Sequence, residues 1–389
     1  MVSETRPAYI LEAADLSLLF GALADSGHTV VAPTARDGVL ALREVESADA
    51  LPAGRTDEQA PGSYRLKDRA DRAVFGHTAG PDSPKRWLHP TAFLRFRSRR
   101  AVSGFTLERG DTSAPKLAFL GIKPCDLAAI GRQDRVLLGG PYAEPAYAAR
   151  RQEAFLVVAQ CTEAHGTCFC ASMGTGPRAE SGFDVGLTEL VEEGRHVLVA
   201  EAGSERGAAL LETIARSRAT EADLAAARAA SVRAESQMGR ALETAGLKEV
   251  LQAKVESPRW EEIERRCLSC ANCTMVCPTC FCSTVEDTTD LTGGVAERWR
   301  RWDSCYTLDF SYIHGGSVRR SVASRYRQWL THKLASWVDQ FGETGCVGCG
   351  RCITWCPVGI DLTEEARAFQ QASAGRQLAP EDVERRPGR

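Results

Sequence analysis

The 389-residue sequence lacks the features that would indicate a membrane, secreted or nucleic-acid-binding protein. No apolar run approaches the ~20 residues that cross a bilayer. The N-terminal segment contains Glu4, Glu12 and Asp15 and has no basic-then-apolar signal pattern. The 48 Lys and Arg nearly balance the 51 Asp and Glu, which gives no argument for a polyanionic partner. We therefore expect a cytoplasmic protein with no membrane span and no nucleic-acid partner.

Familiar catalytic and nucleotide-binding motifs are missing as well. There is no Walker loop, no G-x-G-x-x-G after a strand and no Ser/His/Asp arrangement. The Gly-rich stretch at residues 173–177 opens no evident helix, so it predicts a plain loop rather than a phosphate-binding turn. His165, His314 and His332 have no evident carboxylate partner and are interpreted as structural. The sequence therefore predicts no catalytic residue.

Cysteine, in contrast, is abundant. The chain has 15 cysteines, an odd number, and most of them lie in short C-x-x-C-like spacings. Disulfide frameworks belong to small secreted domains, whereas closely spaced thiols in a reducing compartment more often bind metal. We therefore expect metal ligands rather than disulfides.

Two complete cysteine motifs carry the chemistry. Each reads C-x₂-C-x₂-C-x₃-C-P, the spacing of bacterial ferredoxins, in which three thiolates bind one [4Fe–4S] cluster and the fourth binds the other. The last cysteine of each motif should therefore ligate the cluster of the other motif. The first cluster is assigned to Cys267, Cys270, Cys273 and Cys356, and the second to Cys346, Cys349, Cys352 and Cys277.

A zinc site is the alternative for a single motif of this kind, because zinc also takes four thiolates. Zinc ribbons use two separated C-x-x-C pairs, however, whereas this chain has two full motifs that each end in Cys-Pro. Crossed ligation holds the clusters close together, and neighbouring one-electron centres conduct electrons rather than catalyse a reaction. The 68 residues between the motifs look helical, and this long gap resembles the α-helical ferredoxin domain of succinate dehydrogenase iron–sulfur subunits.

Seven cysteines lie outside these ligand sets: Cys125, Cys161, Cys168, Cys170, Cys280, Cys282 and Cys305. The last three lie in or near the first motif and are interpreted as thiols beside a cluster or as buried thiols. The first four match the number that a third cluster needs, and glycines crowd the loop that holds three of them. Against this, Cys125 is 36 residues from Cys161. A third iron–sulfur cluster and free thiols both stay open.

The pattern of elements predicts an α+β protein in which an N-terminal α/β domain precedes a C-terminal α-helical ferredoxin domain with two [4Fe–4S] clusters. The N-terminal domain is expected at residues 1–204 and a helical connector at 205–258. The dicluster domain follows at 259–371, and a polar tail at 372–389 is expected to be disordered.

Local patterns predict individual elements. Apolar runs predict strands at 28–32, 38–45, 116–122 and 154–160, and a hairpin formed by 183–188 and 196–200. Residues 51–67, rich in Pro, Gly and charge, predict an exposed loop, and the basic run at 97–100 predicts a solvated turn. Thr220 and Asp223 have capping-box spacing, so we expect a helix to begin after Thr220. Residues 319–341 have the apolar spacing of an amphipathic helix.

The segment between the motifs is basic. Its Lys and Arg residues outnumber its acidic ones, and they include Arg298, Arg300, Arg301, Arg319, Arg320, Arg325, Arg327 and Lys333. Cations near an anionic cluster should raise its reduction potential, and a charged patch can steer a redox partner. An ordinary solvated helix face is the alternative. We take Arg319, Arg320 and Arg325 as the best candidates for a partner contact.

The cysteine-rich part resembles a known family. The segments that show this resemblance are residues 266–282, 302–305, 314–316 and 345–360, together with 121–126, 166–170 and 173–176 further upstream. They are similar to the iron–sulfur β subunit of sulfhydrogenase-type cytoplasmic nickel–iron hydrogenases. The iron–sulfur electron-transfer subunit of anaerobic sulfite reductase shares the pattern. The resemblance spans about residues 115–365 and is most specific in its last third.

The resemblance implies a non-catalytic electron-transfer subunit. In a hydrogenase it would relay electrons between the nickel–iron small and large subunits and a flavin- and NAD(P)-binding subunit. In the alternative, the partner would be a sirohaem-type sulfite reductase. Two other classes are weaker interpretations: a redox-inert structural use of the clusters, and a self-contained flavin enzyme, for which the chain offers no dinucleotide fingerprint.

Overall fold

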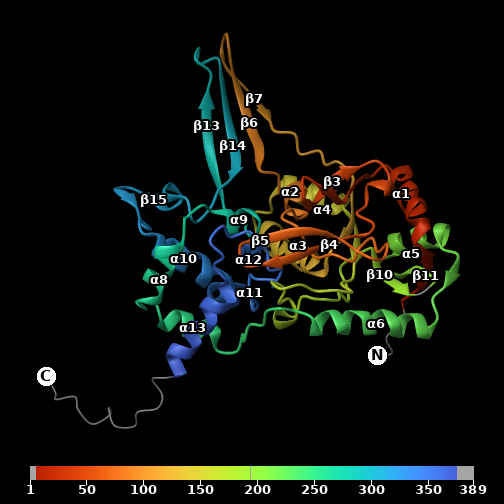
Figure 1. The fold of residues 1–389 in the computed structure, drawn as a ribbon. Helices are drawn as coiled ribbons and strands as arrows, with labels where there is room; N and C mark the ends of the chain where they lie inside the picture. The colour runs from red at the N-terminus through yellow and green to blue at the C-terminus, as the bar shows by residue number, and fades with distance from the viewer. Residues whose placement is uncertain (1–5, 193, 375–389) are drawn as a thin grey trace.

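The computed structural model describes residues 6–192 and 194–374. They form a body of mixed helices and sheets from which a narrow antiparallel arm projects (Figure 1). Within these residues no helix is long and apolar enough to cross a bilayer. Of the tail expected at 372–389, residues 375–389 lie outside the described residues, and 372–374 belong to helix α13 (Leu362–Ala374).

The N-terminal part is built on an eight-stranded mixed sheet in the order β12-β1-β11-β10-β9-β8-β2-β3. The central run from β2 through β8 and β9 to β10 is parallel, and the outer pairs are antiparallel. The strands are β1 (Ala8–Glu12), β2 (Thr29–Arg36), β3 (Val39–Val45), β8 (Leu117–Ile122), β9 (Phe155–Ala159), β10 (Val185–Glu192), β11 (Arg195–Ala202) and β12 (Ser217–Arg218).

Helices cover both faces of this sheet, which explains the continuous apolar runs of β8 and β9. In β9, Val157 and Ala159 belong to the core beneath the first helix pair, and Leu156 and Val158 to the core beneath the second. The first pair is α1 (Leu16–Asp25) and α5 (Glu205–Ile214), and the second is α3 (Pro124–Leu137) and α4 (Pro145–Glu153). The alternation places every residue of β9 in a core.

The strands expected from the apolar runs are confirmed as β2, β3, β8 and β9, and the hairpin as the antiparallel pair β10–β11. The connector contains α5, α6 (Glu221–Ser236) and α7 (Leu247–Ala253), separated by the short strand β12 and by loops. The capping box is confirmed: Thr220 Oγ1 accepts from the Asp223 amide, and the Asp223 carboxylate accepts from the Thr220 amide.

Two local predictions are wrong. Residues 51–67, expected as a loop, contain most of the hairpin β4 (Arg55–Ala60) and β5 (Ser63–Asp68). The inward side chains of β4 are Asp57 and Gln59, which are buried and satisfied by hydrogen bonds with Thr78, so the strand has no apolar signature. The basic run at 97–100, expected as a turn, lies inside strand β6 (Ala92–Ala101).

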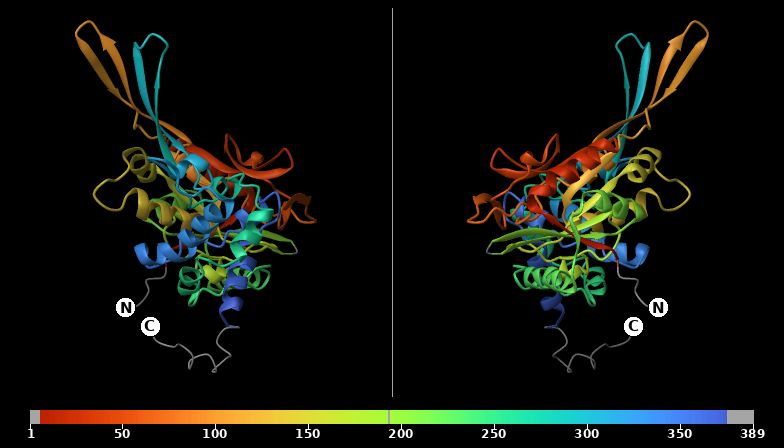
Figure 2. Two further views of the ribbon diagram at one scale, coloured as in Figure 1. Left: turned by 90° about the vertical axis from the view of Figure 1, so that its left-hand side faces the viewer. Right: turned by 90° about the vertical axis from the view of Figure 1, so that its right-hand side faces the viewer.

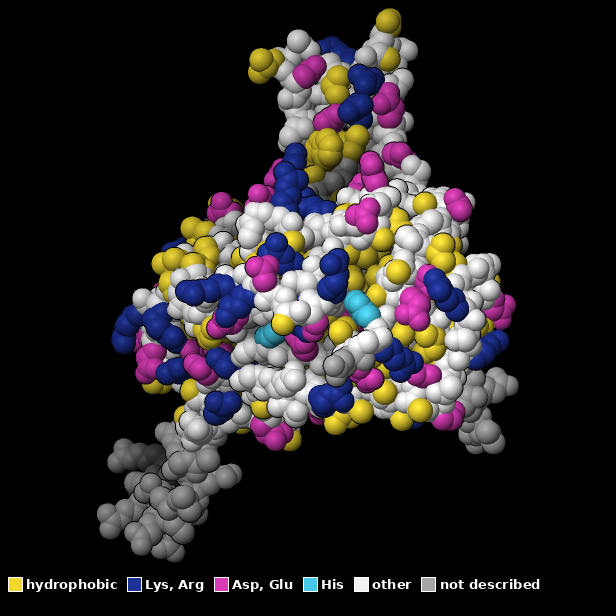
Figure 3. All heavy atoms as spheres, turned by 45° about the vertical axis from the view of Figure 1, so that its right-hand side comes forward, with side chains coloured by type: hydrophobic (Ala, Val, Ile, Leu, Met, Phe, Trp, Pro, Cys, Tyr) yellow, Lys and Arg dark blue, Asp and Glu magenta, His cyan; other side chains and the backbone are white. Residues whose placement is uncertain are grey.

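The arm is a four-stranded antiparallel sheet made by two distant parts of the chain. Its order is β13-β14-β6-β7, with β13 (Ser283–Thr289), β14 (Val295–Trp302) and β7 (Gly104–Arg109). Strands β14 and β6 pair along the centre, and the two hairpins diverge toward their tips (Figure 2). Hydrophobic side chains lie at the ends of the arm, with charges of both signs along it (Figure 3). The gap between the motifs was expected to be helical, but its first half contains the hairpin β13–β14. The α-helices of the gap lie in its second half.

The C-terminal part packs helices around an aromatic core that includes Trp260, Tyr326, Trp329 and Phe369. The amphipathic pattern of 319–341 is confirmed as α10 (Val322–Thr331), a π-helical turn (His332–Ser336) and α11 (Trp337–Phe341). The remaining short elements are α2 (Lys85–Leu88), α8 (Arg259–Arg266), α9 (Asn272–Met275), α12 (Arg351–Thr354), β15 (Tyr312–Ile313), β16 (Gly316–Ser317), and the 3₁₀ turns Ala13–Asp15, Ala48–Ala50, Ala171–Met173 and Leu308–Ser311.

The N-terminal half also encloses the second cysteine motif. At the tip of the β4–β5 hairpin, the amide of Gly62 donates to the carbonyl oxygen of Ile353 (3.1 Å), and Tyr64 stacks on Trp355 with ring centroids 5.2 Å apart. The buried Arg351 donates to the carbonyl oxygen of Gly80 (2.6 Å). The motif is therefore held from both halves of the sequence.

Candidate iron–sulfur centre

The two cysteine motifs fold into loops of the same backbone geometry. Ser269 and Ala271 in the first motif have φ angles of 53° and 64°, and Gly348 and Gly350 at the equivalent positions of the second have 63° and 74°. These left-handed residues flank the second cysteine of each motif and turn the chain around a common centre. Non-glycine residues seldom adopt this conformation, so its presence at Ser269 and Ala271 marks a functional constraint.

Peptide N–H groups point at the sulfurs inside both loops. The amide of Ser269 lies 3.4 Å from Cys267 Sγ, and that of Gly348 lies 3.4 Å from Cys346 Sγ. A short helix follows each loop, α9 in the first motif and α12 in the second. Such N–H···S bonds stabilise thiolate charge and are one of the factors that set a cluster's reduction potential.

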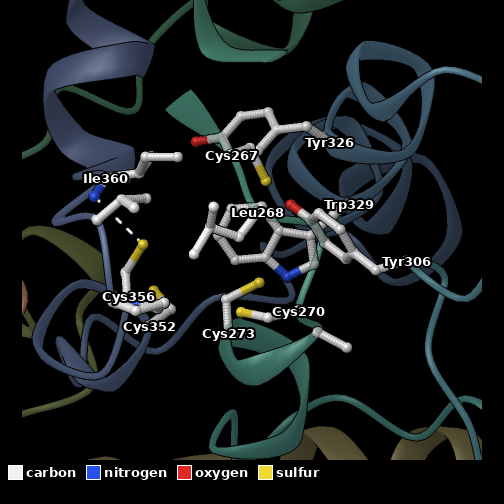
Figure 4. A pocket seen from close by; sticks show the side chains of 13 residues that line it. Cys267, Leu268, Cys270, Cys273, Tyr306, Tyr326, Trp329, Cys352, Cys356 and Ile360 are labelled. Atoms are coloured by element: carbon white, nitrogen blue, oxygen red, sulfur yellow. Dashed lines mark hydrogen bonds between the residues drawn. The ribbon is translucent and has the colours of Figure 1, made fainter. Parts of the chain in front are cut away.

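Thiols from both motifs line one cavity near the surface (Figure 4). Its predicted ligands are Cys267, Cys270, Cys273 and Cys356. The Ile360 amide donates to Cys356 Sγ (3.3 Å), while Tyr326 and Trp329 supply apolar walls. Burial raises the pKa of Cys273. We call this group of four thiols site 1.

The second group of thiols lies deeper. Cys277, from the end of the first motif, interacts electrostatically with three thiols of the second motif, Cys346, Cys349 and Cys352. Cys277 and Cys346 are buried, whereas Cys270 in site 1 is exposed. Burial raises the pKa of Cys346 to about 12, and the charge of Lys333 opposes this rise. We call these four thiols site 2.

Buried lysines compensate charge at site 2. Lys333, in the π-helical turn, is buried, and its Nζ donates to Cys277 Sγ (3.0 Å) and Thr279 Oγ1 (2.9 Å). Lys85 is also buried, and its Nζ donates to the carbonyl oxygen of Cys277 (2.8 Å). A hydrogen bond from Cys280 and the positive charge of Lys333 hold the pKa of Cys277 well below its usual value. The thiolate form of Cys277 is therefore favoured.

This donor set fits four-iron clusters better than single ions. Among residues 6–192 and 194–374, no three His, Cys, Asp or Glu side chains are grouped so as to hold a metal ion. A [4Fe–4S] cluster instead takes one thiolate on each iron, so its ligands stand around a larger body. All fifteen cysteines are free thiols. The wrapped loops, the N–H···S contacts and the compensating cations suit a group of this size and charge.

The lysines that contact site 2 belong to no motif in the sequence. Lys333 was counted only as part of a basic segment, although it lies on the helix whose apolar face was recognised, and Lys85 carried no signal. The expected partner contact needs correction, because Arg325 is only 8% exposed and is not available on the surface. Arg300 is also buried and donates to the carbonyl oxygen of Pro90 (2.6 Å).

The remaining cysteines fall into two groups. Cys280 hydrogen bonds with Cys277, and Cys282 with Cys305, so these three thiols lie beside sites 1 and 2. The other group is in the N-terminal part and consists of Cys125, Cys161, Cys168 and Cys170, in which the structure brings Cys125 close to the thiols of the loop at 161–170.

Comparisons with known proteins agree with this arrangement. The family described as "4Fe-4S dicluster domain" matches residues 266–360, which contain both motifs and the segment between them. The sulfhydrogenase 2 subunit beta of Pyrococcus furiosus is 34% identical over 249 residues, which cover 63% of this chain and 72% of that protein. This chain belongs to the sulfhydrogenase β-subunit family. No solved structure matches it.

Membership in the sulfhydrogenase β-subunit family confirms the resemblance carried by the cysteine motifs. It identifies an iron–sulfur, electron-transfer protein of the hydrogenase-subunit type with a C-terminal 4Fe–4S dicluster domain. In this β-subunit chain the mixed eight-stranded sheet precedes that domain in sequence and contacts its second motif through hairpin β4–β5.

Proposed function

We propose that the chain relays electrons through two [4Fe–4S] clusters between the nickel–iron heterodimer of a cytoplasmic hydrogenase and its flavin- and NAD(P)-binding subunit. Each cluster, held by four of the eight motif cysteines, would accept and pass on one electron at a time. The observation that carries the proposal is the exchange of terminal cysteines: Cys356 lines site 1 and Cys277 lies among the thiols of site 2.

The exchange makes the two sites neighbours. Cys352 of site 2 borders the cavity of site 1 and interacts electrostatically with Cys273. Clusters held by these thiols would be separated by little more than the cysteine side chains. An electron could pass between them without any movement of the protein.

The two sites differ in access to a partner. Site 1 has the exposed Cys270 and is bordered by Leu268, whose side chain is 64% exposed. Site 2 is covered by the β4–β5 hairpin and by the segment that carries Lys85. Site 1 is therefore the better point for electron exchange with another subunit.

In the proposed activity, other chains would supply the nickel–iron site and the flavin site. The homologue's name, a subunit of a sulfhydrogenase, supports a hetero-oligomeric complex. Iron–sulfur clusters held by the eight motif cysteines would give this chain a role in that complex without a substrate pocket of its own.

Purification of the native complex under anaerobic conditions tests the proposal. We expect nickel and flavin to co-purify with the chain, and NAD(P)H to reduce its clusters within the complex. Sirohaem without nickel would instead identify a sulfite reductase complex and refute the hydrogenase assignment. Oxidation of NADH by the isolated chain would refute the relay role itself.

A further inference from the structure

Four thiols of the N-terminal part meet at the carboxyl ends of two parallel strands. Cys125 lies in the first turn of α3, directly after β8, and Cys161 follows β9. Cys168 and Cys170 lie further along the loop that begins at Cys161. This edge of a parallel sheet is where α/β proteins commonly bind ligands.

The four sulfurs are close enough to influence one another's ionisation. Burial raises the pKa of Cys170, and neighbouring charges on Cys161 and Cys168 raise it further. Cys125 in turn interacts with Cys170, and both side chains belong to one buried cluster with Val347. All four are free thiols. The group therefore consists of four reduced cysteines drawn from two separate segments.

The loop is fixed tightly against the second motif. The amide of Phe169 donates to the carbonyl oxygen of Gly348 (3.0 Å), and Thr175 Oγ1 donates to that of Val347 (2.7 Å). A Cβ on Gly348 would lie 2.6 Å from Cys170 Cα, and one on Gly176 would lie 2.9 Å from Cys170 Sγ. Glycine at both positions allows this close approach.

Positive charge is available to balance four thiolates. The buried Arg351 interacts with Cys125 and with Cys349 of site 2, and it also pairs with Asp126 (2.8 Å). The buried Lys123 interacts with Cys161. Cys125 also lies near the N-terminus of the 14-residue helix α3, whose dipole favours an anion.

We propose that Cys125, Cys161, Cys168 and Cys170 bind a third [4Fe–4S] cluster. This inference rests on the proposed relay and extends it. On binding, the four thiols lose four protons and each sulfur bonds one iron of the cluster. The third cluster would accept one electron from the reduced cluster of site 2, which would thereby be oxidised, and would pass that electron to the flavin or nickel–iron centre of a partner subunit.

The position of the third cluster gives the relay an order. Cys349 of site 2 interacts with Cys125, Cys168 and Cys170, whereas a different site 2 thiol, Cys352, interacts with Cys273 of site 1. Electrons would therefore pass along a row of three clusters, with site 2 in the middle. The third cluster would form an end of the row at the N-terminal sheet, opposite the end at site 1.

Iron analysis of the full chain tests the third cluster. After anaerobic reconstitution and removal of unbound iron, we expect about twelve iron and twelve sulfide per chain, from three four-iron clusters. The C168S/C170S variant should retain about eight of each, together with the electron paramagnetic resonance signals of sites 1 and 2. C305S is the matched control, because it removes a buried thiol outside the three ligand sets, and it should retain about twelve.

Other outcomes would overturn the inference. A wild-type chain with about eight iron, unchanged in C168S/C170S, would leave two working clusters and no third. One zinc per chain, lost in C168S/C170S, would replace the third cluster with a zinc site. The wild-type count needs no variant, so it decides the question even if C168S/C170S does not fold. Fewer than about six iron in the wild type would instead contradict the two motif clusters and the relay.

Discussion

Replacement of Lys333 by methionine should lower the reduction potential of the site 2 cluster. The substitution keeps the length of the side chain but removes a buried charge and the hydrogen bond to Cys277 Sγ at 3.0 Å. Reduction would add one negative charge to the cluster, and we take its separation from the ammonium as about 5 Å because Lys333 Nζ lies 3.0 Å from the ligand atom Cys277 Sγ. With an effective dielectric constant of about 20, the lost attraction is about 3 kcal/mol. For one electron this equals about 130 mV, and the potential should fall by up to that amount.

Redox titration of the full chain, followed by electron paramagnetic resonance, measures the effect. The site 2 signal should move to lower potential, and site 1 should shift less because Lys333 contacts Cys277 rather than a site 1 thiol. Lys248→Met is the matched control, since Lys248 is paired with Asp339 on the surface and should leave both potentials in place. An unshifted site 2 potential in a variant with full iron content would refute the assigned role of Lys333.

Two further predictions concern the geometry of the ligands. Cys277→Ala and Cys346→Ala should each remove the site 2 cluster and give matching electron paramagnetic resonance spectra, whereas Cys267→Ala should remove the site 1 cluster. Matching spectra for Cys277→Ala and Cys267→Ala would contradict crossed ligation. Gly348→Ala should lower the iron content by about four per chain, because the added Cβ would lie 2.6 Å from a backbone atom and the residue has a φ of 63°. The control variant Ser269→Gly should retain its full iron content. Equal iron content in both variants would show that the Gly348 position tolerates a side chain.

Much of the fold could be predicted because its signals are local. The apolar runs of β8 and β9 are long enough to be buried on both faces, and the Thr220 capping box fixes the start of α6 through two hydrogen bonds. The β4–β5 hairpin was missed for a physical reason. Its buried residues Asp57 and Gln59 are stabilised by hydrogen bonds to residues distant in sequence, which leave no hydrophobic pattern.

The arm shows a second limit of local signals. Strand β6 is paired with β14, about 200 residues away, and cross-strand ion pairs such as Arg97–Glu297 join the two strands. Seen alone, a run of arginines predicts a solvated turn. When the neighbouring strand β14 places Glu297 opposite this arginine run, the run can form a strand of a half-exposed sheet.

In the candidate site, too, the features with a local sequence signal could be predicted and the long-range contacts could not. The ligand assignment follows from the spacing of the motif cysteines alone. The structure agrees with it locally, because the left-handed residues on either side of the second cysteine turn each motif around one centre. The cations of site 2 could not be predicted, since Lys333 and Lys85 reach it from elements far from either motif. Their charges act through space, and spacing along the chain carries no information about them.

The packing of the two halves also bears on how the clusters are protected. Site 2 is enclosed because hairpin β4–β5 and the Lys85 segment close over the second motif, whereas site 1 is closed mainly by the aromatic core of the C-terminal helices. Water and small oxidants would therefore meet a cluster bound at site 1 before one bound at site 2. Because Arg351 joins the second motif to Gly80 and to Asp126, folding of the N-terminal sheet and cluster binding at site 2 should stabilise each other. In the proposed relay, the N-terminal half would enclose site 2, and the exposed Cys270 would leave site 1 open to electron exchange with a partner.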